Sequence, residues 1–189
     1  MPTSITFLRH AQSLGNVAVY ERGAAAFEDT SLIDCGLTEA GLAAAQEARA
    51  MHESVGYDRI YCSPARRCVQ TLLAVLPAAA EMPVCVDWRL LEFRGVAQFN
   101  ELGAEERTWP AAWNSEKWRD ERAEKETEYA VAERISDWWG ELLLKRDPTD
   151  SHILVVSHAF PITMWCGLYE EEDFRPRPCE AHVLKNWLS

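Results

Sequence analysis

The sequence of 189 residues predicts an α/β fold, a three-layer α/β/α sandwich with a mainly parallel central sheet and a helical insertion. Short apolar runs, typical of buried strands, alternate along the chain with longer segments rich in helix-forming residues. One stretch, residues 97–135, interrupts this alternation and is expected to be the insertion. The length and the 48% hydrophobic content suit one domain over residues 1–189.

Five apolar runs predict the strands of the sheet. The run that ends at Ser157 is the most apolar, which is typical of a strand buried on both faces. The last run is shorter and more polar, and we expect it to form an edge strand. In chain order the predicted strands are residues 5–8, 58–63, 84–87, 153–157 and 181–184.

The segments between these runs carry helix signals. Thr38 is placed to cap a helix that continues to about His52. Pro64 suits the first position of a helix that ends before Pro77. Pro161 fits only the first turn of the helix that follows the fourth strand. The predicted helices are residues 38–52, 64–76, 127–144 and 159–168.

The composition argues against several classes of function. A formal net charge of −11 repels nucleic-acid backbones, so we expect no nucleic-acid partner. No apolar run approaches the roughly 18–20 residues that span a bilayer, and the first strand begins too early for a signal peptide. The six cysteines show no metal-binding spacing. We therefore expect a cytoplasmic protein with free thiols, no membrane partner, no metal and no cofactor.

Polar side chains follow four of the predicted strands at the point where each strand ends. Arg9 and His10 follow the first strand, and His158 follows the fourth. Arg67 lies in the first turn of the helix after the second strand, and Glu92 comes shortly after the third. The carboxyl ends of parallel strands share one edge, where open α/β sheets bind ligands. An arginine at that edge can hold a phosphate bidentately, and a histidine beside it can attack the phosphorus.

Each of these residues also has an interpretation without chemistry. His10 could be a polar strand end, His158 a core histidine with a satisfied ring, and Glu92 a surface carboxylate. Arg67 could be a solvated helix residue, and Asn16 could begin a helix as its cap. The functional interpretation is favoured because separate parts of the chain supply the partners that a phosphate site needs.

As a set, these motifs resemble the histidine phosphatase superfamily, the phosphoglycerate mutase-like group. The family's opening Arg-His-Gly, with a following Ser and Asn, is matched by Arg9-His10-Ala11, Ser13 and Asn16. The pattern Ser-x-x-x-Arg-Ala-x-Gln-Thr selects Arg67 rather than its neighbour Arg66, because only one of two adjacent helical residues faces a given site. The matched segments, in the family's order, are residues 9–16, 37–41, 63–71, 90–92, 126–134 and 157–159.

The resemblance implies a phosphatase that hydrolyses a small phosphorylated metabolite, a phosphate monoester, through a phosphohistidine on His10. Glu92 would act as general acid and base, inorganic phosphate would be the product, and no metal would take part. A phosphoglycerate mutase-type isomerase and a non-catalytic phosphate-binding module remain as alternatives. The residues implied in phosphate binding are Arg9, Ser13, Asn16, Arg67, His158 and the backbone of Ala159.

The chain departs from the family pattern at several places. Ala11 and Ala159 replace glycines, which matters only if the backbone there needs a positive φ or a very close approach. The glycine after Glu92 comes one residue earlier than in many members, so the geometry of that loop is open. Arg94 either contacts the substrate or is a surface residue. The insertion would form a lid over the pocket, and its tryptophans are expected mainly as packing anchors: Trp109, Trp113 and Trp118.

Overall fold

One six-stranded sheet forms the centre of the fold, and its strands are β1 (Ser4–Arg9), β2 (Arg59–Cys62), β3 (Val84–Asp87), β4 (Asn114–Glu116), β5 (His152–Ser157) and β6 (Ala181–Lys185). Their order across the sheet is β4-β3-β2-β5-β1-β6. All neighbours pair in parallel except β6, which runs antiparallel to β1 at the edge. The computed structural model describes residues 4–93, 109–116, 126–145, 147, 149–169 and 174–185.

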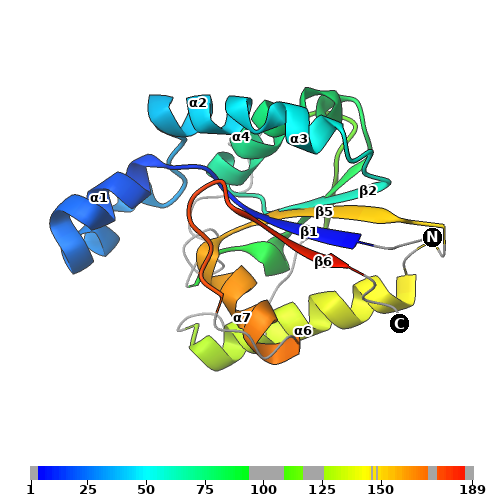
Figure 1. Ribbon diagram of the computed structural model, residues 1–189. Coiled ribbons are helices and arrows are strands. Elements are labelled where there is room, and N and C mark those ends of the chain that lie inside the picture. Colours follow the sequence, from blue (N-terminus) through cyan, green and yellow to red (C-terminus); the bar gives the residue numbers. More distant parts are fainter. Residues whose placement is uncertain are drawn as a thin grey trace.

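Helices cover both faces of this sheet, as the sequence predicts. Figure 1 shows α2, α3 and α4 on one face, α6 and α7 on the other, and α1 projecting beyond the sheet. No helix in the described ranges is long and apolar enough to cross a membrane. The α-helices are α1 (Leu14–Arg22), α2 (Glu39–Glu47), α3 (Arg49–Glu53), α4 (Arg66–Val75), α6 (Glu128–Lys145) and α7 (Ala159–Tyr169). Short 3₁₀ helices are η1 (Gly23–Glu28), η2 (Thr30–Leu32), η3 (Pro77–Ala80) and η4 (Trp88–Leu90).

The central strands are apolar on both faces because each face packs against a helical layer. Successive strand residues point to opposite sides, so Leu8 joins the core beneath α4 while Phe7 joins the core beneath α6 and α7. In the second core, Phe7 packs against Trp138 and Trp165 at ring-centroid distances of 6.3 and 4.4 Å. Trp138 and its neighbour Trp139 therefore serve the packing of α6 on the sheet.

A close contact between α2 and the segment after β1 fixes the course of the chain beyond His10. Thr38 caps α2, and its Oγ1 accepts the Gly41 N–H at 2.9 Å. A Cβ at Gly41 would lie 2.0 Å from the carbonyl oxygen of Gln12, so only glycine allows this approach. The Leu-Thr-x-x-Gly pattern at residues 37–41 is thus explained by packing.

Two of the predicted elements are wrong in detail. The helix expected from Pro64 begins at Arg66, because the Arg66 N–H donates to Asp34 Oδ1 at 2.7 Å and Pro64 remains in the preceding turn. The insertion expected to be helical contains β4, which pairs with β3 at the edge of the sheet. His52, near the end of the predicted helical segment 38–52, is buried, and its Nδ1 lies 2.9 Å from the Tyr57 hydroxyl.

Candidate functional site

The carboxyl ends of β1, β2 and β5 bring the predicted site residues to one edge of the sheet. The His10 N–H donates to the Ser157 carbonyl at 2.9 Å, which extends the β1–β5 pairing by one residue. The rings of His10 and His158 lie 5.1 Å apart between centroids, at an interplanar angle of 66°. Two histidines that are distant in sequence therefore share the centre of the site.

The His10 ring is buried, with 2% of the residue exposed, and one hydrogen bond defines its tautomer. Its Nδ1 lies 2.7 Å from the Ala11 carbonyl oxygen. Because a carbonyl can only accept, Nδ1 carries the proton and Nε2 keeps its lone pair. Burial, the Arg67 charge and the Arg9 charge hold the pKa of His10 well below its usual value, against an upward effect of the Ala11 carbonyl. His10 is therefore a neutral imidazole at pH 7.

The His158 ring is fully buried, and both of its nitrogens have partners. Nδ1 lies 3.2 Å from Nη2 of Arg67, and Nε2 lies 2.8 Å from Oγ of Ser63. A guanidinium only donates, so Nδ1 accepts and Nε2 carries the proton toward Ser63. Burial, with the charge of Arg67 as the next cause, holds the pKa of His158 well below its usual value. His158 is thus also neutral in this arrangement.

Arg67 and Arg66 point in different directions from the first turn of α4. Arg67 donates to the Ile33 carbonyl at 3.3 Å and to His158, whereas Arg66 is exposed. The structure therefore places Arg67, not Arg66, at the site. The same helix holds the segment after β1, because Thr71 Oγ1 accepts the Ala11 N–H at 3.0 Å.

Arg9 and the segment that precedes β6 lie together. Nη1 of Arg9 donates to the Pro176 carbonyl at 2.8 Å, and the Cys179 N–H donates to the His10 carbonyl at 3.3 Å. Nε of Arg9 is buried with no hydrogen-bond partner among the described residues, which leaves a donor for an anion. Burial lowers the pKa of Arg9, while the Glu92 carboxylate opposes this effect.

Five of the predicted site residues line one cavity of about 160 Å³: His10, Ser13, Asn16, Arg67 and Glu92. Glu92 is partly buried, and its Oε1 accepts the Phe93 N–H at 3.0 Å. The cavity thus combines a neutral imidazole, a cation and a carboxylate. Arg9 and His158 adjoin these residues without lining the cavity.

Ser13 and Asn16 form the capping box that begins α1. Ser13 Oγ accepts the Asn16 N–H at 3.3 Å, and Asn16 Oδ1 accepts the Ser13 N–H at 3.0 Å. The helix-initiating interpretation of Asn16 is therefore correct in part, with Ser13 as the cap and Asn16 as its reciprocal partner. The box uses only the oxygen of the Asn16 amide, so its Nδ2 group and the Ser13 hydroxyl proton can still donate to a ligand.

The alanines at the two family glycine positions fit without backbone strain. Among the described non-glycine residues, only Cys179 has a positive φ, so neither Ala11 nor Ala159 needs glycine. Ala159 is the first residue of α7, and its N–H is one of those that lack an intrahelical acceptor. The loop after Glu92, including Arg94, lies outside the described residues.

The described part of the insertion supports a packing role for its tryptophans. The Trp113 indole N–H donates to the Ala79 carbonyl at 2.7 Å, and Trp109 packs against the core beneath α4. Trp118 lies outside the described residues. None of the six cysteines forms a disulfide, and the described residues contain no cluster of three or more His, Cys, Asp or Glu side chains that could hold a metal.

The sequence did not single out several side chains that hold the site together. Ser63 orients His158, Thr71 holds Ala11, and Ser157 Oγ donates to the Leu90 carbonyl at 2.8 Å. Arg134 reaches the backbone beside Glu92 from α6. Ser63, Thr71 and Arg134 fall inside the matched motifs, and that position was the available signal for them.

Comparisons with known proteins agree with this architecture. The chain resembles a Bacillus anthracis phosphoglycerate mutase (16% identity, TM-score 0.66, 97% of this chain and 88% of that chain). It also resembles a mycobacterial glucosyl-3-phosphoglycerate phosphatase in complex with VO3 (19%, 0.65, 96% and 92%) and an Entamoeba histolytica phosphoserine phosphatase (17%, 0.61, 96% and 89%). No match is found among curated proteins. The family model of the histidine phosphatase superfamily (branch 1) matches residues 5–176, and the chain therefore belongs to that superfamily.

Proposed function

We propose that this chain is a phosphatase that hydrolyses the phosphate monoester of a small metabolite through a phosphohistidine on His10. The observation that carries the proposal is the state of His10: a buried, neutral imidazole whose Nδ1 proton is bound to Ala11, beside a cation and a carboxylate in one cavity. Such a ring offers the lone pair of Nε2 as a nucleophile. The phosphatases among the structural neighbours support the same reaction class.

In the first step, Nε2 of His10 attacks the phosphorus while the ester P–O bond opposite it breaks. Arg67 and Arg9 stabilise the charge on the equatorial oxygens, and further hydrogen bonds come from Ser13, Asn16 and the Ala159 N–H. Protonated Glu92 gives its proton to the departing oxygen. The products are the free alcohol and a phosphorylated His10.

In the second step, the Glu92 carboxylate takes a proton from water as the water oxygen attacks the phosphorus. The P–N bond breaks, its electron pair returns to Nε2 of His10, and inorganic phosphate leaves. His158 changes its role when phosphate binds, because a dianion beside it favours the protonated ring. Its Nδ1 then donates to the phosphate. The Arg67 N–H group, whose hydrogen bond Nδ1 had accepted, donates to the phosphate as well.

Rapid quenching with a radiolabelled phosphate monoester tests the proposal. The wild-type protein should yield an acid-labile, alkali-stable phosphoenzyme, and H10A should yield none. H182A is the matched control, since His182 lies on the edge strand β6 and should leave the adduct unchanged. Phosphate release without an adduct would contradict the mechanism.

Two further assays separate the alternatives. Conversion of 3-phosphoglycerate to its isomer, primed by the bisphosphate, would identify a mutase. Tight phosphate binding without turnover of any aryl phosphate would identify a binding module. The proposed phosphatase shows net hydrolysis in both assays.

A further inference from the structure

Arg134 lies beneath the segment that carries Glu92, and its guanidinium is fully used there. It is 2% exposed, comes from α6 and is not among the residues that line the cavity. Nε donates to Glu126 Oε1 at 2.6 Å, Nη2 donates to the Glu92 carbonyl at 3.0 Å, and Nη1 donates to the Arg89 carbonyl. One planar side chain therefore holds two main-chain carbonyls that are three residues apart.

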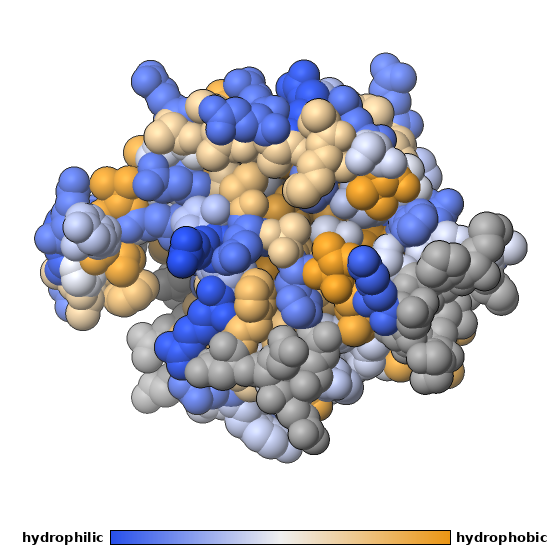
Figure 2. All heavy atoms as spheres, in the orientation of Figure 1, coloured by the Kyte–Doolittle hydropathy of each residue, from blue (hydrophilic) through white to orange (hydrophobic). Residues whose placement is uncertain are grey.

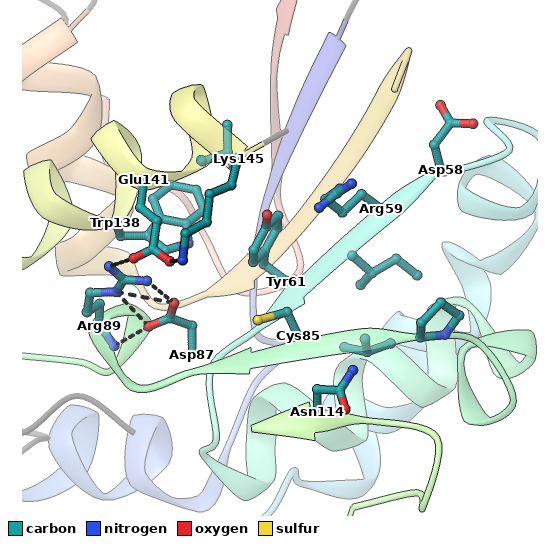
Figure 3. A pocket seen from close by; sticks show the side chains of 14 residues that line it. Asp58, Arg59, Tyr61, Cys85, Asp87, Arg89, Asn114, Trp138, Glu141 and Lys145 are labelled. Atoms are coloured by element: carbon teal, nitrogen blue, oxygen red, sulfur yellow. Dashed lines mark hydrogen bonds and ion pairs between the residues drawn. The ribbon is translucent and has the colours of Figure 1, made fainter. Parts of the chain in front are cut away.

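Neighbouring contacts hold the same segment from two other directions. The carbonyl of Leu90 accepts the Ser157 hydroxyl at 2.8 Å. The Arg89 side chain bonds Asp87 on β3, at 2.6 Å from Nη2, and Glu141 on α6, at 2.7 Å from Nη1 (Figure 3). Glu92 thus follows a segment that is tied to the end of β3, to β5 and to α6.

The charge of Arg134 is matched where it is buried. Glu126, which pairs with it, is also buried, so the two opposite charges compensate each other inside the protein. Arginine suits this place better than lysine, because its fork presents donors in fixed directions to two acceptors. A point charge alone would not fix the distance between the two carbonyls.

We infer that Arg134 is the positioning residue that sets the Glu92 carboxyl at its distance from Nε2 of His10. The inference rests on the proposed function, in which Glu92 protonates the leaving oxygen. Arg134 itself does not line the cavity that His10 and Glu92 share. Its effect on the reaction acts through the backbone of Glu92.

This role predicts a dependence on the leaving group. Protonation by a general acid contributes typically 10²–10⁴-fold for a poor leaving group and little for a good one. In R134M, kcat for an alkyl phosphate should fall at least about tenfold more than kcat for 2,4-dinitrophenyl phosphate. R134K, which keeps the charge but loses the fork, should show the same selective loss.

R59M is the control variant for R134M. R59M removes an arginine that pairs with Asp150 at the amino end of β2, and it should change both substrates by the same factor. In an E92Q background, R134M should cause no further selective loss, because the acid is already absent. Equal losses with both substrates in R134M and R134K, or a full additional loss in E92Q, would overturn the inference alone. A wild-type protein inactive on both substrates would overturn the proposed function as well.

Apolar side chains from α1, η1 and η2 form one wall of the cavity. Phe27 on η1 is 68% exposed although it lines the cavity, and Val19 on α1 is also exposed there. Figure 1 shows that this part of the chain projects beyond the sheet, and Figure 2 shows hydrophobic side chains exposed on it. The apolar side chains that line this wall are Val19, Ala26, Phe27, Leu32, Ile33 and Phe93.

The charged group on this wall is an anion. Asp29 lines the cavity, its Oδ2 pairs with Arg22 at 3.0 Å, and its Oδ1 accepts from Ser31. Among the described residues that line the cavity, Arg67 is the one Arg or Lys, and it lies at the phosphate end. A carboxylate on the leaving group would therefore lose water against apolar carbon and find no free cation among the described residues of this wall, because Asp29 already pairs with Arg22. An uncharged hydrocarbon would instead exclude water from the wall.

We propose that the substrate is a phosphate monoester of an uncharged, largely apolar alcohol. This proposal also rests on the proposed function. Wild-type kcat/KM should be higher for hexyl phosphate than for methyl phosphate, and higher than for 3-phosphoglycerate. F27A should lose about tenfold with hexyl phosphate and less than about twofold with methyl phosphate, because only the longer chain reaches the wall.

Y20A provides the control for a general effect on α1. Tyr20 is 92% exposed, does not line the cavity, and should leave both values unchanged. Equal losses for the two alkyl phosphates in F27A, or a preference for 3-phosphoglycerate, would overturn the substrate class and leave the phosphatase intact. Absence of hydrolysis with all three esters would instead overturn the phosphatase itself.

Discussion

The Nδ1 atom of His158 accepts a hydrogen bond from Arg67 across 3.2 Å, so a neutral imidazole beside the cavity contacts a permanent cation that lines it. On the other side of the ring, the Ser63 hydroxyl oxygen accepts a hydrogen bond from the Nε2–H group at 2.8 Å. Two groups for which we propose a role in phosphate binding thus bond each other. An anion that binds to Arg67 must therefore replace the His158 ring as the acceptor of this hydrogen bond.

Removal of the Arg67 side chain should weaken the stabilisation of the transition state far more than removal of the Arg66 side chain. We expect R67M to lower kcat/KM by roughly 10²–10³-fold, because a partly buried cationic donor to the transferring group is lost. R66M should change it less than about twofold, since Arg66 is exposed to solvent and its side chain points away from the site. Steady-state kinetics with an aryl phosphate measure both, and similar losses in the two variants would contradict the assignment.

Anion binding should take up a proton on His158. The pKa of His158 is well below its usual value in the free protein, and a bound dianion raises it. The affinity for the anion should therefore increase as the pH falls through the pKa of the complex. Tungstate is a suitable probe because it remains a dianion near neutral pH. Calorimetry in buffers of different ionisation enthalpy should show proton uptake in the wild type and none in H158N. Uptake that persists in H158N would assign the proton elsewhere.

Stability should decrease on mild acidification because three buried histidines have lowered pKa values: His10, His52 and His158. As the pH falls below about 6.5, the unfolded chain binds protons at these rings while the folded chain does not, so the free energy of unfolding falls. Each ring contributes at most about 1.4 kcal/mol per pH unit until its folded pKa is reached.

Urea unfolding at several pH values between about 7.5 and 5.5 measures how the free energy of unfolding depends on pH. This pH range lies above the range where carboxylates titrate. H52Q should reduce the slope without affecting the site, since His52 lies on α3, bonds Tyr57 and does not line the cavity. A free energy of unfolding that stays constant over this range would contradict the expected burial of neutral rings.

The contact between Gly41 and Gln12 should make position 41 intolerant of any side chain. G41A places a methyl group 2.0 Å from a main-chain oxygen, and we expect a destabilisation of about 1–3 kcal/mol, with reduced activity because the segment after His10 shifts. G140A is the matched control. Gly140 lies within α6 with no atom within 4 Å of an added Cβ, so this variant should gain about 0.5–1 kcal/mol. Equal effects on stability would contradict the steric argument.

The strands and the residues at their ends could be predicted from the sequence because burial on two faces imposes a simple apolar pattern. Elements without such a pattern could not. Helix α1 buries only Ala18, so it has no apolar stripe, and β4 is three polar residues long. Their positions depend on tertiary contacts, such as the pairing of β4 with β3.

The same distinction holds within the site. Arg9, His10, Arg67 and His158 are recognisable because each lies at the end of a strand or shortly after it. The contacts that orient the site are not recognisable in this way, because the Ser63–His158 bond joins residues 95 positions apart and the Arg134–Glu92 bond joins residues 42 positions apart. The neutral state of His10 likewise depends on burial and on the direction of one carbonyl, which only the folded chain defines.

The backbone around His10 also has a consequence for biosynthesis. His10 leaves the ribosome long before Ser157, Pro176 and Cys179, yet these residues supply an acceptor for its N–H, an acceptor for the Arg9 guanidinium and a donor to its carbonyl. A nascent chain that ends before residue 157 lacks all three contacts. His10 therefore acquires these surroundings only when synthesis has passed the end of β5 and the turn before β6, so under the proposed function a partly made chain would be inactive.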